Sequence, residues 1–141
     1  MVQPTALVAS SIASVEMNEA VAQLAADSGV LRDVAGRRFE AGYEAIELGF
    51  EHGTLRLTCN GNTDEIVVDA SERRDALDEI VNDDSLTDLL GKVIDQAWMM
   101  VNDRGYTDAF QLRCIDLATR SESCRQFEVA ASAITVAHVS I

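Results

Sequence analysis

Apolar side chains recur with helical periodicity in the first part of the chain. The run extends from residue 15 to residue 25, after Ser14 as a candidate N-cap and before Gly29 as a candidate helix-ending glycine. This pattern predicts one amphipathic N-terminal helix of about three turns. The apolar positions are Val15, Met17, Ala20, Val21, Leu24 and Ala25.

The pattern changes to a period of two in the middle of the chain. Residues 46–50 and 55–58 alternate apolar side chains with polar or small ones, which is typical of strands with one buried face. Asn60-Gly61 is a strong hairpin signal, and it leads into the apolar residues 65–68. These segments predict a three-stranded meander.

A helical connector and three more strands are expected in the second half. Ser71 is a candidate N-cap for a helix over residues 72–81, and a shorter helical turn is predicted over residues 86–90. The alternation slips near Ser132, which indicates a β-bulge in the last strand. The strand patterns occupy residues 92–101, 110–114 and 127–131.

Together these segments predict an α+β fold. It has a single, mostly antiparallel sheet of about six strands, an N-terminal helix packed on one face, and a helical connector between two β-meander halves. A length of 141 residues suits one domain over residues 1–141, in which residues 1–14 form a mobile lead-in.

A short repeat indicates an internal duplication. The segment LRDVAGR at residues 31–37 is matched by LTDLLGK at residues 86–92. Each copy is expected to form a one-turn helix ended by a glycine, then a strand that opens with a basic residue. Duplication would give copies over residues 31–70 and 86–141. Coincidence is the alternative, because the motif is short.

Charge and cysteine content narrow the class of protein. The chain has 24 acidic and 11 basic residues and a formal net charge of −13. This argues against direct binding of nucleic acid or an anionic membrane, because both need clustered Lys and Arg. The apolar runs are shorter than the roughly 20 residues that a membrane helix requires. A secretory signal begins with a basic region, and no Lys or Arg precedes Arg32, so we expect no signal peptide. Cys59, Cys114 and Cys124 form no CxxC pair, so we expect no disulfide framework, no zinc site and a cytoplasmic location.

Recognisable catalytic motifs are missing from the sequence. His52, in a predicted turn, and His138, near the C-terminus, stand in no metal-ligand spacing. The nucleophile-elbow, P-loop and dinucleotide-binding patterns do not occur. A calcium-loop pattern that starts at Asn60 fails, because Glu65 stands where glycine is required. The sequence therefore predicts no enzyme, no cofactor and no metal site.

Acidic residues concentrate between residues 64 and 88. This stretch holds ten acids and two bases, a net charge of −8 out of the total of −13. Two interpretations are open: a solvated, solubilising face, or a docking surface whose negative potential speeds association with a basic partner. The acids are Asp64, Glu65, Asp69, Glu72, Asp75, Asp78, Glu79, Asp83, Asp84 and Asp88.

A second informative stretch runs from residue 98 to residue 108 and holds the single tryptophan of the chain. In a structural interpretation, Trp98 and Tyr106 face each other across a hairpin, and Gly105 supplies a positive φ in its turn. In a functional interpretation, exposed aromatic and arginine side chains anchor a partner. The candidate residues are Trp98, Asn102, Arg104, Tyr106 and Asp108.

The same region carries a turn, a strand and a hairpin with a distinct residue pattern: Gly91-Lys92, Trp98, Asn102 and Gly105-Tyr106-Thr107-Asp108. This pattern resembles a family of small acidic bacterial proteins of unknown function, in which the three elements follow an acidic middle segment. The resemblance covers residues 31–117. It implies an immunity-type protein of a bacterial toxin system, a binder rather than an enzyme, and it carries no catalytic residue across.

We therefore expect a non-catalytic acidic protein that binds and neutralises or regulates a basic protein partner, such as a toxin or a nuclease. The acidic segment would steer association, and the bound protein would occlude the partner's active cleft. Two alternatives stay open. One is a small-molecule-binding domain or enzyme with a pocket near Trp98 and Tyr106. The other is a homo-oligomer, such as a homodimer, that pairs the edge of its last strand across the interface.

Overall fold

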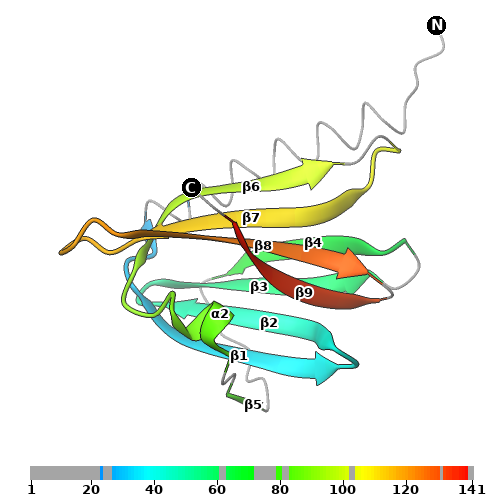
Figure 1. Cartoon of the computed structure of the whole chain (residues 1–141), viewed down its shortest axis with the longest axis horizontal. Coiled ribbons are helices and arrows are strands. Elements are labelled where there is room, and N and C mark those ends of the chain that lie inside the picture. The colour runs from blue at the N-terminus through cyan, green and yellow to red at the C-terminus, as the bar shows by residue number, and fades with distance from the viewer. Residues whose placement is uncertain are drawn as a thin grey trace, which may run out of the picture.

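The computed structural model is built almost entirely from antiparallel strands (Figure 1). It describes residues 23, 27–60, 63–71, 79–80, 83–101, 104–130 and 132–139. Its elements are β1 (Leu31–Phe39), β2 (Gly42–Phe50), β3 (Gly53–Asn60), β4 (Glu65–Ser71), β5 (Glu79–Ile80), α2 (Asp84–Thr87), β6 (Val93–Val101), β7 (Thr107–Ile115), β8 (Glu122–Ala130) and β9 (Ala133–Val139).

The sheet consists of two four-stranded meanders. Strands β1 to β4 pair in chain order, and so do β6 to β9. The strand order is β4-β3-β2-β9-β8-β7-β6, with β1 on the other edge of β2 and the short β5 on β1. The meanders join where Tyr43 of β2 pairs with Ile134 of β9, and again where Val30 forms a bridge with Val93.

The join between β2 and β9 explains why residue 42 is a glycine. A Cβ atom on Gly42 would lie 2.3 Å from the carbonyl oxygen of Ile134, well inside van der Waals contact. The backbones of β2 and β9 therefore approach each other at a point where a side chain does not fit.

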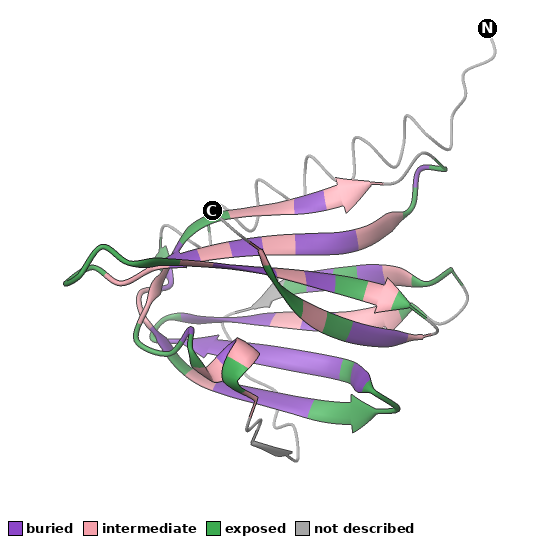
Figure 2. Ribbon diagram, in the orientation of Figure 1, coloured by how far each residue is buried: buried purple, intermediate pink, exposed green. Residues whose placement is uncertain are grey.

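The apolar core lies between the two meanders (Figure 2). The sheet folds back on itself so that β4 packs against β7, and the rings of Phe110 and Phe127 lie 6.1 Å apart in the interior. Leu86 and Leu89, from α2 and the turn after it, are fully buried. This short helical segment packs against β1 and β9.

The α+β prediction is wrong: among the described residues, nine strands accompany the four-residue helix α2 and the separate helical positions Gln23 and Asp27. The predicted N-terminal helix over residues 15–25 falls largely outside the described residues, as do residues 72–78 of the predicted connector. Residues 79–80, which were expected to be helical, form β5.

Two strands were not predicted. Strand β1 has two register shifts against β2, and it contains the adjacent charges of Arg37 and Arg38, so its alternation is irregular. The expected bulge near Ser132 is a hairpin turn that starts β9: Ala130 pairs with Ala133, and Ser132 has a φ of 64°. In the strand order β9 lies between β8 and β2, and it pairs with β2 at one residue pair, Tyr43 with Ile134. A dimer through the edge of the last strand stays a prediction.

The other strand predictions are confirmed, and they correspond to β2, β3, β4, β6, β7 and β8. The short helical turn is present as α2 and the turn that follows. The two segments of the repeat differ, because residues 31–37 form a strand whereas residues 86–92 begin in α2 and continue through a turn. The expected one-turn helix is therefore found in the second copy and not in the first.

Candidate functional site

The start of β4 and the start of β7 are held together by hydrogen bonds. The Thr107 backbone N–H donates to Glu65 Oε2 at 3.0 Å, and the Thr107 hydroxyl lies 3.3 Å from the same oxygen. The Thr107 hydroxyl also lies 3.4 Å from the carbonyl oxygen of Ile66. This contact brings the acidic segment beside the turn that carries Tyr106.

A second carboxylate ties the β8–β9 turn to the same end of the molecule. Asp64 Oδ1 accepts hydrogen bonds from the Ser132 backbone N–H at 3.0 Å and from its hydroxyl at 3.4 Å. Both residues have positive φ, 51° for Asp64 and 64° for Ser132. The β3–β4, β6–β7 and β8–β9 turns thus meet at one end, on the right in Figure 1. We call this end the turn corner: residues 63–69, 104–108 and 132.

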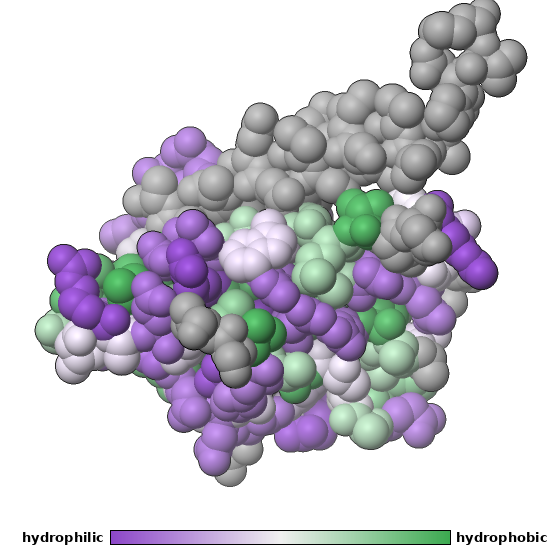
Figure 3. Space-filling view, turned by 45° about the horizontal axis from the view of Figure 1, so that its top comes forward, coloured by the Kyte–Doolittle hydropathy of each residue, from purple (hydrophilic) through white to green (hydrophobic). Residues whose placement is uncertain are grey.

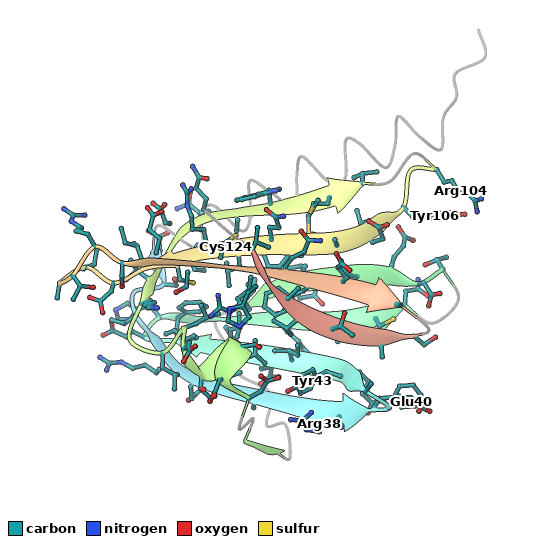
Figure 4. The ribbon with its side chains drawn as sticks, in the orientation of Figure 1. Arg38, Glu40, Tyr43, Arg104, Tyr106 and Cys124 are labelled. Carbon is teal, nitrogen blue, oxygen red and sulfur yellow. The ribbon has the colours of Figure 1, made fainter. Side chains whose placement is uncertain are left out.

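The turn corner presents aromatic, apolar and charged side chains to solvent. Tyr106 is 42% exposed and Val67 is 36% exposed, while Arg104 and Asp69 are also exposed. Figure 4 shows Arg104 and Tyr106 side by side at this tip. Gly105, between them, has the positive φ that the sequence predicted, 86°. The structure therefore brings the start of the acidic stretch, residues 64–69, next to the end of the aromatic stretch, residues 104–108.

The acidic residues near α2 have a different role. Asp83 is the N-cap of α2 and accepts hydrogen bonds from the Ser85 backbone N–H at 3.0 Å and from the Tyr43 hydroxyl at 2.9 Å. The Arg38 guanidinium lies 4.9 Å from the centre of the Tyr43 ring; both side chains are labelled in Figure 4. Asp83 thus connects α2 to β2.

These contacts shift the pKa values of both partners. Burial and the hydrogen bond to Asp83 raise the pKa of Tyr43 to about 12. Burial acts to raise the pKa of Asp83, but the hydrogen bonds from Ser85 and Tyr43 outweigh it and lower that pKa below its ordinary value. Asp83 is therefore a charged structural cap.

Other predicted site residues are dispersed. Trp98 pairs with Gln111 of β7, and not with Tyr106, because Tyr106 precedes that strand; the predicted facing of the two aromatics is wrong. Asp84 is exposed on α2, Asp88 approaches Arg125, and Asp108 is half-buried in β7. The backbone of Glu79 lies in β5. Four predicted positions lie outside the described residues: Glu72, Asp75, Asp78 and Asn102.

A cavity of about 460 Å³ opens between the ends of β8 and β9, close to α2. Arg125, which was not singled out from the sequence, lines it together with His138 and Asp88. A second cavity, of about 350 Å³, surrounds the turn between β2 and β3 and is lined by His52 and Asp33. Neither cavity includes Trp98 or Tyr106.

The described part of the chain contains no group of histidine, cysteine and acidic residues arranged to hold a metal ion. The three cysteines are all free thiols. Burial raises the pKa of Cys114 to about 12. No helix among the described residues is long and apolar enough to cross a membrane.

Comparison with curated proteins and comparison with solved structures each gave no significant match. A protein-family model, by contrast, matches residues 17–140, which covers every strand and α2. Its description is "Family of unknown function (DUF6334)", and the chain belongs to this family.

Proposed function

We propose that the protein is a non-catalytic, acidic binding protein that neutralises or regulates a basic protein partner in the manner of an immunity protein, and that the turn corner is its docking surface. The observation that carries the proposal is the pair of bonds from Thr107 to Glu65. They place exposed Tyr106 beside the acidic strand β4. Tyrosine and arginine are frequent anchors of protein interfaces.

The charge of the chain supports a basic partner. A net charge of −13 creates a negative potential that attracts a basic protein and raises its association rate. On the face shown in Figure 3, hydrophilic side chains lie among apolar ones. Because Asp64, Glu65 and Asp83 are used in internal hydrogen bonds, direct contacts with the partner would come from exposed acids such as Asp69.

A cytoplasmic location forms part of the proposal. The three thiols are free, as is usual in a reducing compartment.

The test is capture from a lysate of the native organism with wild-type protein and with two variants of the turn corner. Tyr106→Ala removes the exposed aromatic anchor, and Asp69→Asn removes one charge. We expect wild type to retain a basic protein at low salt and less of it at high salt. Tyr106→Ala should weaken binding about tenfold or more, and Asp69→Asn should mainly slow association and reduce its salt dependence.

Leu117→Ala and Asp84→Asn are the matched controls. Leu117 is 62% exposed in the β7–β8 turn, and Asp84 is exposed on α2, so both lie outside the turn corner. The controls should bind as wild type does. Equal capture by wild type and Tyr106→Ala, or capture that does not respond to salt, would show the proposal to be wrong.

A further inference from the structure

A buried arginine lies on the inner face of the second meander. Arg125 is 5% exposed, and strand register places it between Leu112 of β7 and His138 of β9. Phe127, two residues further along β8, belongs to the core, and side chains two apart on a strand share a face. A charge in such a position needs compensation from its surroundings.

The hydrogen bonds of Arg125 leave part of its guanidinium available. Nε donates to the carbonyl oxygen of Ser85 at 2.6 Å, and Nη1 donates to that of Cys124 at 3.1 Å. A guanidinium has five N–H donors, so these two bonds use a minority of them. Nη2 lies 3.8 Å from Asp88 Oδ2, which is an ion-pair distance but too long for a hydrogen bond. The side chain of Asp88 is 57% exposed, so this carboxylate is held loosely.

The cavity of about 460 Å³ gives access to this group. It is an open depression rather than an enclosed cavity, and its volume is within the range of small-molecule sites. Ser123 and His138 line it together with Arg125. Lys92 Nζ lies 2.7 Å from Ser123 Oγ and places a second cation beside the cavity. In an acidic chain with 11 basic residues, two cations and a histidine therefore gather at one place.

We propose that this cavity binds a small carboxylate, with Arg125 Nη2 as its anchor and Ser123 and His138 as flanking polar groups. The structure already shows a carboxylate, that of Asp88, approaching the guanidinium. Planar carboxylates match the geometry of a guanidinium. Asp88 and Glu122 both line the cavity, and their charges disfavour a doubly charged phosphate more than a singly charged carboxylate.

The chain allows a direct test by proton NMR of the full-length protein, because it contains only two histidines. Sodium acetate is titrated at constant pH and constant ionic strength. We expect the imidazole signals of His138 to shift in a saturable manner, while those of His52, which lines the other cavity, stay in place. Inorganic phosphate should bind more weakly than acetate.

The substitution Asp88→Asn is expected to strengthen the binding of acetate rather than weaken it. The substitution removes the internal carboxylate that competes for Arg125, so acetate should bind about threefold to fivefold more tightly, the range expected for losing one exposed ion pair. Asp84→Asn, which makes the same charge change on α2 outside the cavity, is the control and should alter the affinity by less than about twofold.

The carboxylate could belong to a peptide C-terminus or to a small organic acid. The same titration with N-acetylated trialanine, with a free or an amidated C-terminus, distinguishes these two sources. Tighter binding of the free-acid peptide than of acetate assigns the site to peptide C-termini, and weaker binding assigns it to small organic acids; either result supports a carboxylate site. No shift of His138 with any carboxylate, unchanged affinity in Asp88→Asn, or tighter binding of phosphate than of acetate would overturn the inference. Failure of lysate capture at the turn corner leaves this test unaffected, because the two sites share no residue.

Discussion

We expect the hydrogen bond between Tyr43 and Asp83 to make a measurable contribution to stability. It joins the start of β2 to the N-cap of α2, and the Tyr43 hydroxyl lies 2.9 Å from a carboxylate. Tyr43→Phe removes this hydroxyl and leaves the ring, and hence its contact with Arg38, in place. Asp83→Ala removes the same bond together with the cap of α2.

The magnitude follows from the contacts that each variant loses. A hydrogen bond to a charged group contributes about 1.5–3 kcal/mol. Since Asp83 keeps its bond from Ser85, we expect Tyr43→Phe to lower the free energy of unfolding by about 1–2 kcal/mol. Loss of an N-cap costs about 1 kcal/mol more, so Asp83→Ala should cost about 2–3 kcal/mol. The double variant should cost no more than Asp83→Ala, because the shared bond is lost only once.

Urea unfolding of the four proteins, followed by the fluorescence of the single tryptophan, measures these values. With a slope near 2 kcal/mol per molar urea, the midpoint of Tyr43→Phe should fall by about 0.5–1 M. Additive losses in the double variant, or a change below about 0.3 kcal/mol in Tyr43→Phe, would refute the coupling.

The dependence on pH provides a second check. The pKa of Asp83 is lowered in the folded protein, so its contribution is present above the ordinary aspartate pKa and is lost as the pH falls through the folded value. The pKa of Tyr43 is raised from 10.0 to about 12, so its contribution is complete below pH 10 and is lost as the pH rises through about 12. The difference between wild type and Tyr43→Phe should therefore be constant near neutrality and shrink at both extremes.

Two further predictions concern glycine and cysteine positions. Gly42→Ala should destabilise the protein by about 3 kcal/mol or more, because its Cβ would lie 2.3 Å from a backbone oxygen of Ile134. Gly91→Ala meets no atom within 4 Å of its Cβ, so it should cost only about 1–2 kcal/mol, which is the cost of its left-handed conformation at a φ of 83°. The reverse ranking in thermal unfolding would contradict the β2–β9 contact. In a thiol-reactivity assay on the folded protein, partly exposed Cys59 should react before buried Cys114, whose pKa is about 12; early labelling of Cys114, detected by peptide mapping, would argue against its burial.

The sequence predicted those strands whose side chains alternate cleanly. Residues 46–50 show this well, with Ile46, Leu48 and Phe50 facing the core. Strand β1 was not predicted because two register shifts interrupt its alternation, and because Gly36 was interpreted as the end of a helix. Strand β9 was not predicted because the turn before it depends on a positive φ at Ser132, and sequence patterns rarely indicate a positive φ at a residue other than glycine.

Prediction of the candidate sites was limited by long-range contacts. The acidic segment was recognised, but its local spacing does not reveal that Glu65 bonds to Thr107 or that Asp83 bonds to Tyr43. Arg125 did leave a signal: it stands two residues before Phe127 and therefore on the apolar face of its strand. The predicted membership of a family of unknown function is confirmed, over residues 17–140 rather than 31–117, while its description carries no link to immunity proteins.

The division of the sheet into two meanders has a consequence for the order of folding events. Within each meander, neighbouring strands pair through short connections, whereas the Tyr43–Ile134 and Val30–Val93 joins close much longer loops. Long loops cost more conformational entropy, so we expect the hairpins to form first and the joins to complete the fold. The contacts of Glu65 and Asp64 would then form after the rate-limiting barrier, and replacing these acids would speed unfolding far more than it slows folding. Part of the negative charge of this chain would thereby set how long the folded state persists.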